Sequence, residues 1–415
     1  MAKPIHLHKK IITTTCIGTI LEWAEFTFYA YIALIISQVF FPQMEKKSGL
    51  LASFGIFAIG YLMRPIGAIL FGHIGDLWGR QRSLQWAMCL MGISTFCIGI
   101  LPGYNAIGHW APTLLIVFRC IQGLAVSGEF NGSSIFLMEH SDENPYLAAS
   151  LTGWAAALGM MIGSLSALLI SLPGNPHWTW RIPFLCGAFI GLMGWYIRGS
   201  LKETPVFLRE KNNRMLTKMP LLLTFKSHYK DILKSCTLSA TLGIYIYVAN
   251  VFYATYLVES SNFLPFQAKL TVSFGSLLTI IFFPWAAQKA DQYGGKKIMS
   301  HGLWLMMISA PIIFLTPLSH SLGLVLASQI LYALSDALFC APLFLVVNTL
   351  FPVNVRYTGA SFSWNLSMAC LGGTAPLVST WLQSATNVKI APACYIVFAA
   401  LLALLALQSS FEAKQ

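Results

Sequence analysis

Six ionisable residues lie inside long apolar stretches of the chain, where an uncompensated charge is costly. Two of them, Glu22 and Glu25, are three residues apart and so fall on roughly one face of a helix. Two carboxylates on one face repel each other, and apolar surroundings favour the neutral form of each. One of the pair is therefore expected to hold a proton near neutral pH, which is the chemistry that a proton-coupled carrier needs.

The other four residues are Arg64, Arg119, Glu129 and Asp336. Arg119 and Glu129 are ten residues apart, about 15 Å along a helix, so they are not expected to pair with each other. We expect Arg119 to meet a glutamate of the first helix, and Glu129, alone or with Glu25, to carry the coupling proton. A static ion pair that only joins helices 1 and 4 is the alternative.

The two arginines are candidates for binding a substrate carboxylate, because the planar guanidinium group binds a carboxylate at two points. For Arg64, which precedes Pro65, a structural pair or a side chain extended towards the membrane surface is an equal alternative. Asp336 could face the same cavity and tune the choice of substrate, or it could hydrogen-bond across helices.

Amide and aromatic side chains in the same stretches could complete a substrate site. Gln122, Asn250 and Asn365 could orient a zwitterion, unless they join helices instead. Aromatic faces attract a quaternary ammonium group, although packing and anchoring at the membrane surface are commoner roles. The candidates are Trp23, Tyr29, Tyr31, Tyr245, Tyr247, Tyr253 and Trp364.

The elements that must position these residues are helices that cross a membrane. The chain has 415 residues, of which 56% are hydrophobic and only 10% charged, against about 25% charged in a soluble domain. Runs of about 20 apolar residues indicate membrane-spanning helices. Twelve are predicted, near 12–40, 49–72, 83–102, 112–138, 146–172, 181–199, 232–258, 266–287, 298–316, 321–348, 357–383 and 390–410. Backbone groups must be paired within each span, so the fold class is an all-α membrane protein.

A polar segment divides the twelve helices into two sets of six. We expect residues 1–199 and 232–415 to form two bundles and residues 200–231 to link them in the cytoplasm. Basic residues favour the cytoplasmic side, and most of the 26 Lys and Arg residues fall on that side if the N-terminus is inside. Both termini are then cytoplasmic. The net charge of +11 is explained by this topology and by anionic lipid, not by nucleic acid.

A polar turn between the second and third predicted helices could hold helix ends together. It contains Gly72, Asp76, Gly79, Arg80 and Arg82. An aspartate can cap or pair a neighbouring helix end, and arginines can reach the ends of other helices. A solvated turn that only sets the topology is the alternative.

Two more acids belong to this prediction of a gating loop. Glu139, at the cytoplasmic end of helix 4, is a candidate partner for the arginines. Asp291 occupies the matching place in the second half, because it also precedes a glycine by three positions and is followed by a basic pair, Lys296 and Lys297.

The turn at 72–82 resembles the loop between helices 2 and 3 of the major facilitator superfamily of transporters. Three further stretches resemble the metabolite:proton symporter family within it, particularly the proline/betaine transporters and their dicarboxylate and citrate relatives. They are Leu21–Phe26 in helix 1, Arg119–Gly132 in helix 4 and Phe351–Pro376 leading through helix 11. Three positions depart from the family pattern: Ala24 stands where an aromatic residue is usual, Glu25 replaces Asp, and Ser127 replaces Gly.

The resemblance implies two six-helix bundles in the bacterial inner membrane that move against each other. It implies a secondary active transporter that imports a small zwitterion or carboxylate with protons. A proton-coupled exporter of drugs or siderophores is the first alternative, although helix 5 lacks, over 153–163, the Gly-Pro pair usual in antiporter branches. A receptor of the same fold that binds without transporting is the second.

Other function classes lack their motifs in this sequence. There is no catalytic constellation and no phosphate-binding loop, so we expect no enzyme, no cofactor, no metal and no ATP-driven cycle. The expected partners are the lipid bilayer, a small-molecule substrate and protons, with sodium as the alternative ion. We expect the chain to act as a monomer.

Overall fold

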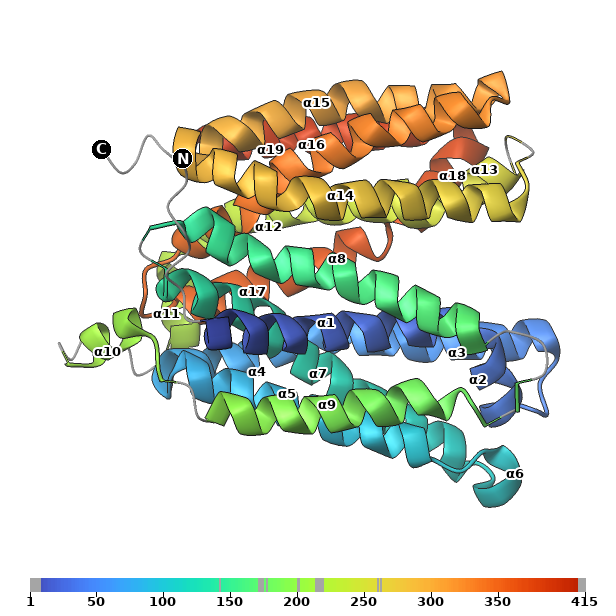
Figure 1. The fold of residues 1–415 in the computed structure, drawn as a ribbon, viewed down its shortest axis with the longest axis horizontal. Helices are drawn as coiled ribbons and strands as arrows, with labels where there is room; N and C mark the ends of the chain where they lie inside the picture. Colours follow the sequence, from blue (N-terminus) through green and yellow to red (C-terminus); the bar gives the residue numbers. More distant parts are fainter. Residues whose placement is uncertain are drawn as a thin grey trace.

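The computed structural model describes residues 9–141, 143–170, 175–176, 178–199, 202–212, 220–259, 261 and 263–409, and most of them lie in helices that run side by side (Figure 1). The first part of the chain forms α1 (Lys9–Tyr31), α2 (Ala33–Phe40), α3 (Lys46–Leu62), α4 (Arg64–Leu77), α5 (Arg80–Ile100), α6 (Tyr104–Ile107), α7 (Trp110–Glu139), α8 (Pro145–Ile170) and α9 (Arg181–Gly199). Two short helices follow, α10 (Pro205–Asn212) and α11 (Pro220–Ser227).

The remaining elements form the second part of the molecule. They are α12 (Tyr229–Ile246), η1 (Tyr247–Phe252), α13 (Tyr253–Glu259), α14 (Pro265–Tyr293), α15 (Gly295–Leu315), η2 (Thr316–Ser319), α16 (Leu322–Thr349), α17 (Arg356–Ser367), η3 (Met368–Gly372), α18 (Ala375–Thr386) and α19 (Ala391–Ser409). Nine segments of the described residues are long and apolar enough to cross a membrane. With α1–α2, α9 and α17–α18 they account for the twelve predicted spans, and the all-α fold class is confirmed.

Four of the predicted spans contain a break or a π-helical turn. The span near 12–40 breaks between α1 and α2, and the span near 49–72 breaks at Met63, just before the Arg64-Pro65 pair. Proline has no N–H and fixes its own φ, so it is favoured at the start of a new helix. The spans near 232–258 and 357–383 contain the π-helical turns η1 and η3, which are rare and frequently mark functional sites.

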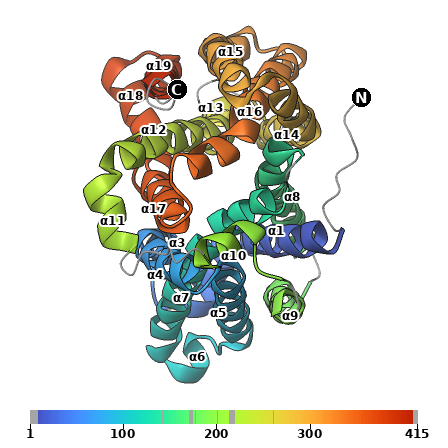
Figure 2. The same cartoon turned by 90° about the vertical axis from the view of Figure 1, so that its left-hand side faces the viewer.

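The helices form two groups. Figure 2 looks along them and separates α12, α14–α16 and α19 from α1, α3–α5, α7 and α9. Within each group the helices pack on one another, and the groups meet where α8 contacts α14 and α16, and where α17 contacts α4 and α7. The helices α10 and α11 lie at one end of the molecule (left in Figure 1), which we call the linker end.

The predicted linker of residues 200–231 is partly helical. It contains α10 and α11 and the start of α12, while residues 213–219 lie outside the described part. The helix α11 packs against α4 of the first group and α17 of the second. The linker therefore contacts the junction of the two groups.

Candidate functional site

A cluster of four aromatic rings joins the two groups of helices. Trp23 of α1 and Phe130 of α7 lie with ring centroids 5.4 Å apart. Phe130 is 5.8 Å from Phe344 of α16 and 5.3 Å from Trp364 of α17. Phe344 and Trp364 are 5.4 Å apart. Of the four, the sequence reading singled out only the two tryptophans, because a phenylalanine in an apolar stretch gives no signal of a site.

Arg64 lies beside this aromatic cluster. Its guanidinium carbon is 5.6 Å from the ring centroid of Trp23 and 4.2 Å from that of Tyr61. The break at Met63 places Arg64 in the first turn of α4, and its side chain is buried. The hydroxyl of Tyr61 is hydrogen-bonded to that of Tyr247 in η1, across the two groups. A cation stacked on aromatic faces at the junction of the groups is suited to hold an anion between them.

Arg119 pairs with a glutamate of the first helix, as predicted, and that glutamate is Glu25. The Nη1 atom of Arg119 is 3.9 Å from Glu25 Oε1 and donates a 2.8 Å hydrogen bond to Oε1 of Gln122. The amide nitrogen of Gln122 donates to Glu25 and, at 2.9 Å, to Thr95 Oγ1. Thr95 Oγ1 in turn donates to Glu25 Oε2 at 2.8 Å. Gln122 thus bridges the ion pair, and Tyr29 stacks 3.5 Å from the guanidinium carbon of Arg119.

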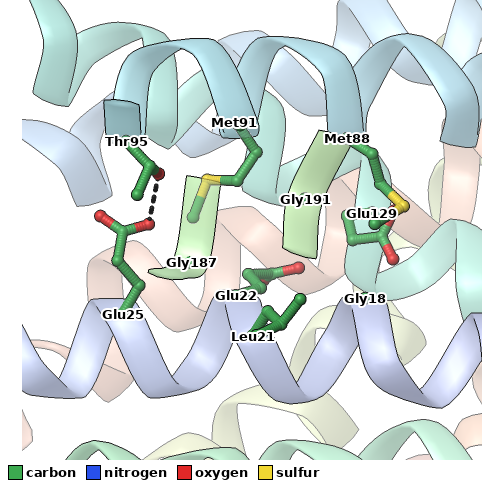
Figure 3. Close-up of a pocket in the computed structure, with 11 residues that line it drawn as sticks. Gly18, Leu21, Glu22, Glu25, Met88, Met91, Thr95, Glu129, Gly187 and Gly191 are labelled. Atoms are coloured by element: carbon green, nitrogen blue, oxygen red, sulfur yellow. Dashed lines mark hydrogen bonds between the residues drawn. The ribbon is translucent and has the colours of Figure 1, made fainter. Parts of the chain in front are cut away.

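The three predicted coupling carboxylates line one small cavity between α1, α5, α7 and α9. Figure 3 shows Glu25, Glu22 and Gly18 following one another along α1, with Glu129 beside Met88 at the far end of the row. The cavity of about 20 Å³ has room for a single water molecule. Ser133 Oγ donates a 3.0 Å hydrogen bond to Glu129 Oε1. The three carboxylates are buried, with exposed fractions of 3%, 6% and 4% for Glu22, Glu25 and Glu129.

Two aspartates of the predicted gating loops cap helices of the opposite group. Asp76 accepts hydrogen bonds from the backbone N–H groups of Tyr357 at 3.1 Å and Thr358 at 2.9 Å, in the first turn of α17. Asp291 accepts from the N–H groups of Tyr146 at 2.9 Å and Leu147 at 3.0 Å, in the first turn of α8. A carboxylate at a helix N-terminus satisfies unpaired donors and interacts with the helix dipole. The loop of the first group therefore caps a helix of the second group, and the loop of the second group caps a helix of the first.

Arg80 is the centre of the first of these two contacts and is fully buried. Its Nη1 donates to the carbonyl of Gly75 and its Nη2 to that of Val353, each at 2.7 Å. It also lies 3.1 Å from Asp76 and 3.5 Å from Glu139. Glu139, the predicted partner, further binds Arg356 at 2.9 Å. This set of contacts joins the two groups at the linker end.

Glycines make the approach of the chains possible at two points of the loop. Gly79 has a φ of 113°, in the region that favours glycine. A Cβ atom at Gly72 would lie 2.7 Å from the Cα of Thr358, so no side chain fits there. Arg82, by contrast, is exposed on α5, and the structure does not bring it to the junction.

Glu203 belongs to the same end of the molecule but is not among the residues predicted for the gating loop. The carboxylate of Glu203 accepts from the N–H of Gln81, at the start of α5, at 3.1 Å and from the N–H of Thr204 at 2.8 Å. Burial is the main cause that raises the pKa of Glu203 above its ordinary value. Thr204 Oγ1 donates to Glu139 Oε2 at 2.6 Å. The start of the linker is therefore part of the closed end.

Three of the predicted substrate ligands make none of the contacts described for Arg64 and Arg119. Asn250, in η1, donates to the hydroxyl of Tyr332 at 2.7 Å. Asn365 donates to the carbonyl of Ser361 in its own helix at 2.8 Å, so this bond does not join two helices. Asp336 is buried in the middle of α16 among the second group of helices.

Comparisons with known proteins place the chain in one superfamily. The sequence pattern of the Major Facilitator Superfamily matches residues 20–376. The glycine betaine/proline/ectoine/pipecolic acid transporter OusA of Dickeya dadantii is 30% identical, covering 96% of this chain and 82% of that protein. The inner membrane metabolite transport protein YhjE of Escherichia coli is 32% identical and covers 99% and 96%. The proline/betaine transporter of Escherichia coli is 28% identical, covering 96% and 82%.

Solved structures show the same fold. The proton:xylose symporter XylE bound to 6-bromo-6-deoxy-D-glucose is similar with a TM-score of 0.75 and 16% identity, covering 98% of this chain and 95% of that one. XylE from Escherichia coli in a partially occluded inward-open conformation is similar with a TM-score of 0.66. These matches cover the chain almost from end to end, so the protein belongs to the Major Facilitator Superfamily of membrane transporters.

Proposed function

We propose that this protein is a secondary active transporter that imports a small zwitterion together with protons by alternating access. The observation that carries the proposal is the buried Arg64 beside the aromatic cluster, at the junction of the two groups. A guanidinium binds a carboxylate, and aromatic faces bind an alkylated ammonium group. The relatives named for proline and glycine betaine transport support this substrate class over di- and tricarboxylates.

The ion pair in the first group supplies the link to protons. When Glu25 takes up a proton, it no longer neutralises Arg119, whose guanidinium then favours a second anion. We propose that Arg119 then joins Arg64 in binding the substrate carboxylate, so that proton and substrate bind together. Gln122 is hydrogen-bonded to both Arg119 and Glu25, so its hydrogen bonds would rearrange when Glu25 takes up the proton. Glu22 and Glu129, along the same cavity, would pass the proton towards the linker end.

The closed linker end fits one half of an alternating-access cycle. We propose that this end faces the cytoplasm, with both termini there, and that residues 1–199 and 232–415 move as two bundles joined by 200–231. Breaking the caps at Asp76 and Asp291 would open the linker end. Substrate would enter from outside while these caps hold.

The test is uptake into proteoliposomes under an imposed inward proton gradient. Purified protein is screened with glycine betaine, proline, citrate and α-ketoglutarate, in sodium-free and sodium-containing buffer. Gradient-dependent uptake of glycine betaine or proline, independent of sodium, supports the proposal. Accumulation only with sodium, or uptake of citrate alone, contradicts the assignment of ion or substrate. Extrusion driven by the gradient would favour an exporter, and binding without uptake would favour a receptor.

A further inference from the structure

A second set of buried polar side chains lies inside the second group of helices, away from the carboxylates of α1 and α7. Gln329, Tyr332 and Asp336 stand three and four residues apart on α16 and therefore share one face of that helix. We call these three residues the polar stripe of α16. Their exposed fractions are 1%, 2% and 4%. Asp336 is near the midpoint of this long helix, where an ionised carboxylate is costly.

Several polar atoms of this stripe lack a hydrogen-bond partner within the described residues. They are Nε2 and Oε1 of Gln329 and Oδ1 of Asp336. Buried polar groups are nearly always hydrogen-bonded, so such atoms point to water or an ion that the protein itself does not supply. In the described part of the chain, no Lys, Arg or His side chain lies within ion-pair distance of Asp336.

The groups that face Asp336 are neutral hydroxyls and a thiol. Its charge acts on the phenol of Tyr245 from α12, and on Tyr332 and Cys340 of its own helix. The helices α8, α14, α15 and α17, which also pack on α16, contribute no cationic partner among the described residues. A carboxyl group in such surroundings is stable with a proton and unstable without one.

Hydrogen bonds connect this stripe to the π-helical turn η1. The hydroxyl of Tyr332 accepts from Nδ2 of Asn250 at 2.7 Å, and the hydroxyl of Tyr245 contacts Ser335 Oγ at 2.6 Å. Asn250 belongs to η1, as does Tyr247, which bonds to Tyr61 of the first group. One hydrogen bond and the turn η1 therefore connect Tyr332, which lies one turn from Asp336 on α16, to the contact between Tyr247 and Tyr61.

The sequence repeats the same spacing in the two halves. In the fourth span, Gln122 precedes Glu129 by seven residues, and in the tenth span Gln329 precedes Asp336 by seven. The fourth and tenth spans are corresponding members of the two sets of six. The residues on α16 thus have a counterpart in α7, which carries Gln122 and Glu129 of the proposed proton path in the first half.

We propose that Asp336 is a second proton-binding site, located in the C-terminal half and reached by water along Gln329 and Tyr332. The carboxyl group takes its proton from water in this stripe and returns it to water, leaving a carboxylate that the hydroxyls of Tyr245 and Tyr332 face. The occupant is a proton and not a sodium ion, because the described surroundings offer one carboxylate and few further oxygen ligands. The site goes beyond the proposed function, which places coupling in the first half only.

The test is an infrared difference titration of purified protein without substrate, so failure of transport does not affect it. The spectra compare acidic and alkaline buffer for wild type, Asp336→Asn and Asp336→Glu, with Asp231→Asn, a half-buried carboxylate paired with His228 at the start of α12, as control. We expect wild type to lose a protonated-carboxyl band as the pH rises. Asp336→Asn should lack that component, Asp336→Glu should show it shifted, and Asp231→Asn should keep it.

Three results would overturn the proposal. Identical difference spectra for wild type and Asp336→Asn would show that Asp336 does not exchange a proton. If Asp336→Asn does not fold, an unshifted band in Asp336→Glu leads to the same conclusion. A band that disappears at constant pH when sodium replaces potassium would assign the site to sodium instead.

Discussion

At the scale of single residues, the account depends on two arginines with different surroundings. Arg119 is paired with Glu25 through Gln122, inside the first group of helices. Arg64 is stacked on aromatic rings at the junction of the groups. The first arrangement suits a group whose charge balance changes with a proton, and the second suits a group that meets the substrate.

Replacing Arg64 with lysine should weaken substrate binding without abolishing folding. Lysine keeps the charge but loses the planar fork that binds a carboxylate at two points. A charge-assisted hydrogen bond contributes about 1.5–3 kcal/mol, so KM for glycine betaine should rise by about 10–100-fold. Initial uptake rates measured over a range of substrate concentrations check this. The matched control is the exposed Arg209→Lys on α10; an Arg64→Lys curve that overlays it would remove Arg64 from the site.

Replacing Gln122 with leucine should destabilise the first group of helices. The amide bonds to Arg119, Glu25 and Thr95, and its loss leaves buried polar atoms without partners, at a cost of about 1–3 kcal/mol. Thermal unfolding in detergent should show a lower Tm than wild type. Gln38→Leu on α2, where the side chain is exposed, controls for the change in polarity. Equal Tm values for the two variants would show that the bridge is not stabilising.

At the scale of elements, the closed linker end consists of two helix caps of the same design. Asp76 caps α17 and Asp291 caps α8. Asparagine has one side-chain acceptor oxygen where aspartate has two, so Asp76→Asn leaves a backbone N–H of α17 without its partner. A lost cap costs about 1–2 kcal/mol, which corresponds to about 5–30-fold faster amide exchange.

Hydrogen–deuterium exchange measures the effect of each cap separately. Asp76→Asn should accelerate exchange at the start of α17, and Asp291→Asn at the start of α8. Asp231→Asn, in the first turn of α12, should change neither. Unaltered exchange at Tyr357 and Thr358 in Asp76→Asn would contradict the role assigned to that carboxylate.

Glu203, two residues before α10, adds a pH-dependent contact to the same end. Burial raises the pKa of Glu203 above its ordinary value of 4.5, so the folded state holds this proton more tightly than the unfolded state does. The stability that Glu203 contributes is then complete below pH 4.5 and is lost as the pH rises through the raised pKa. The Tm of wild type relative to Glu203→Gln should therefore fall with rising pH. Parallel curves for the two proteins would contradict this.

Local sequence predicts some of these elements and not others. The apolar runs predict the spans because length and hydrophobicity depend on neighbouring residues alone. The contacts of Asp76 and Glu139 are predictable because a charge at a helix end needs a partner. The break at Met63 has a local signal in the proline that follows Arg64. The π-helical turn η1 and the approach of Tyr61 to Tyr247 depend on packing between distant helices, so no local pattern shows them.

At the scale of the whole molecule, the proposed function assigns the coupling of protons to substrate to the carboxylates of the first group and the arginine at the junction. In that proposal, the caps keep the linker end closed while proton and substrate bind, and the two groups tilt when the caps break. In the first half, Glu25 is the carboxylate that is bonded directly to the residues around Arg119. That Glu25 carries the coupling proton is therefore the central claim.

The measurement that tests this claim most directly is proton movement with substrate in proteoliposomes that hold a pH-sensitive dye. Glycine betaine is added without a pre-existing gradient, to wild type and Glu25→Gln, with the exposed Glu45→Gln as control. We predict internal acidification for wild type and Glu45→Gln, and none for Glu25→Gln, which should still exchange labelled for unlabelled substrate. Acidification by Glu25→Gln at the wild-type rate would contradict the account.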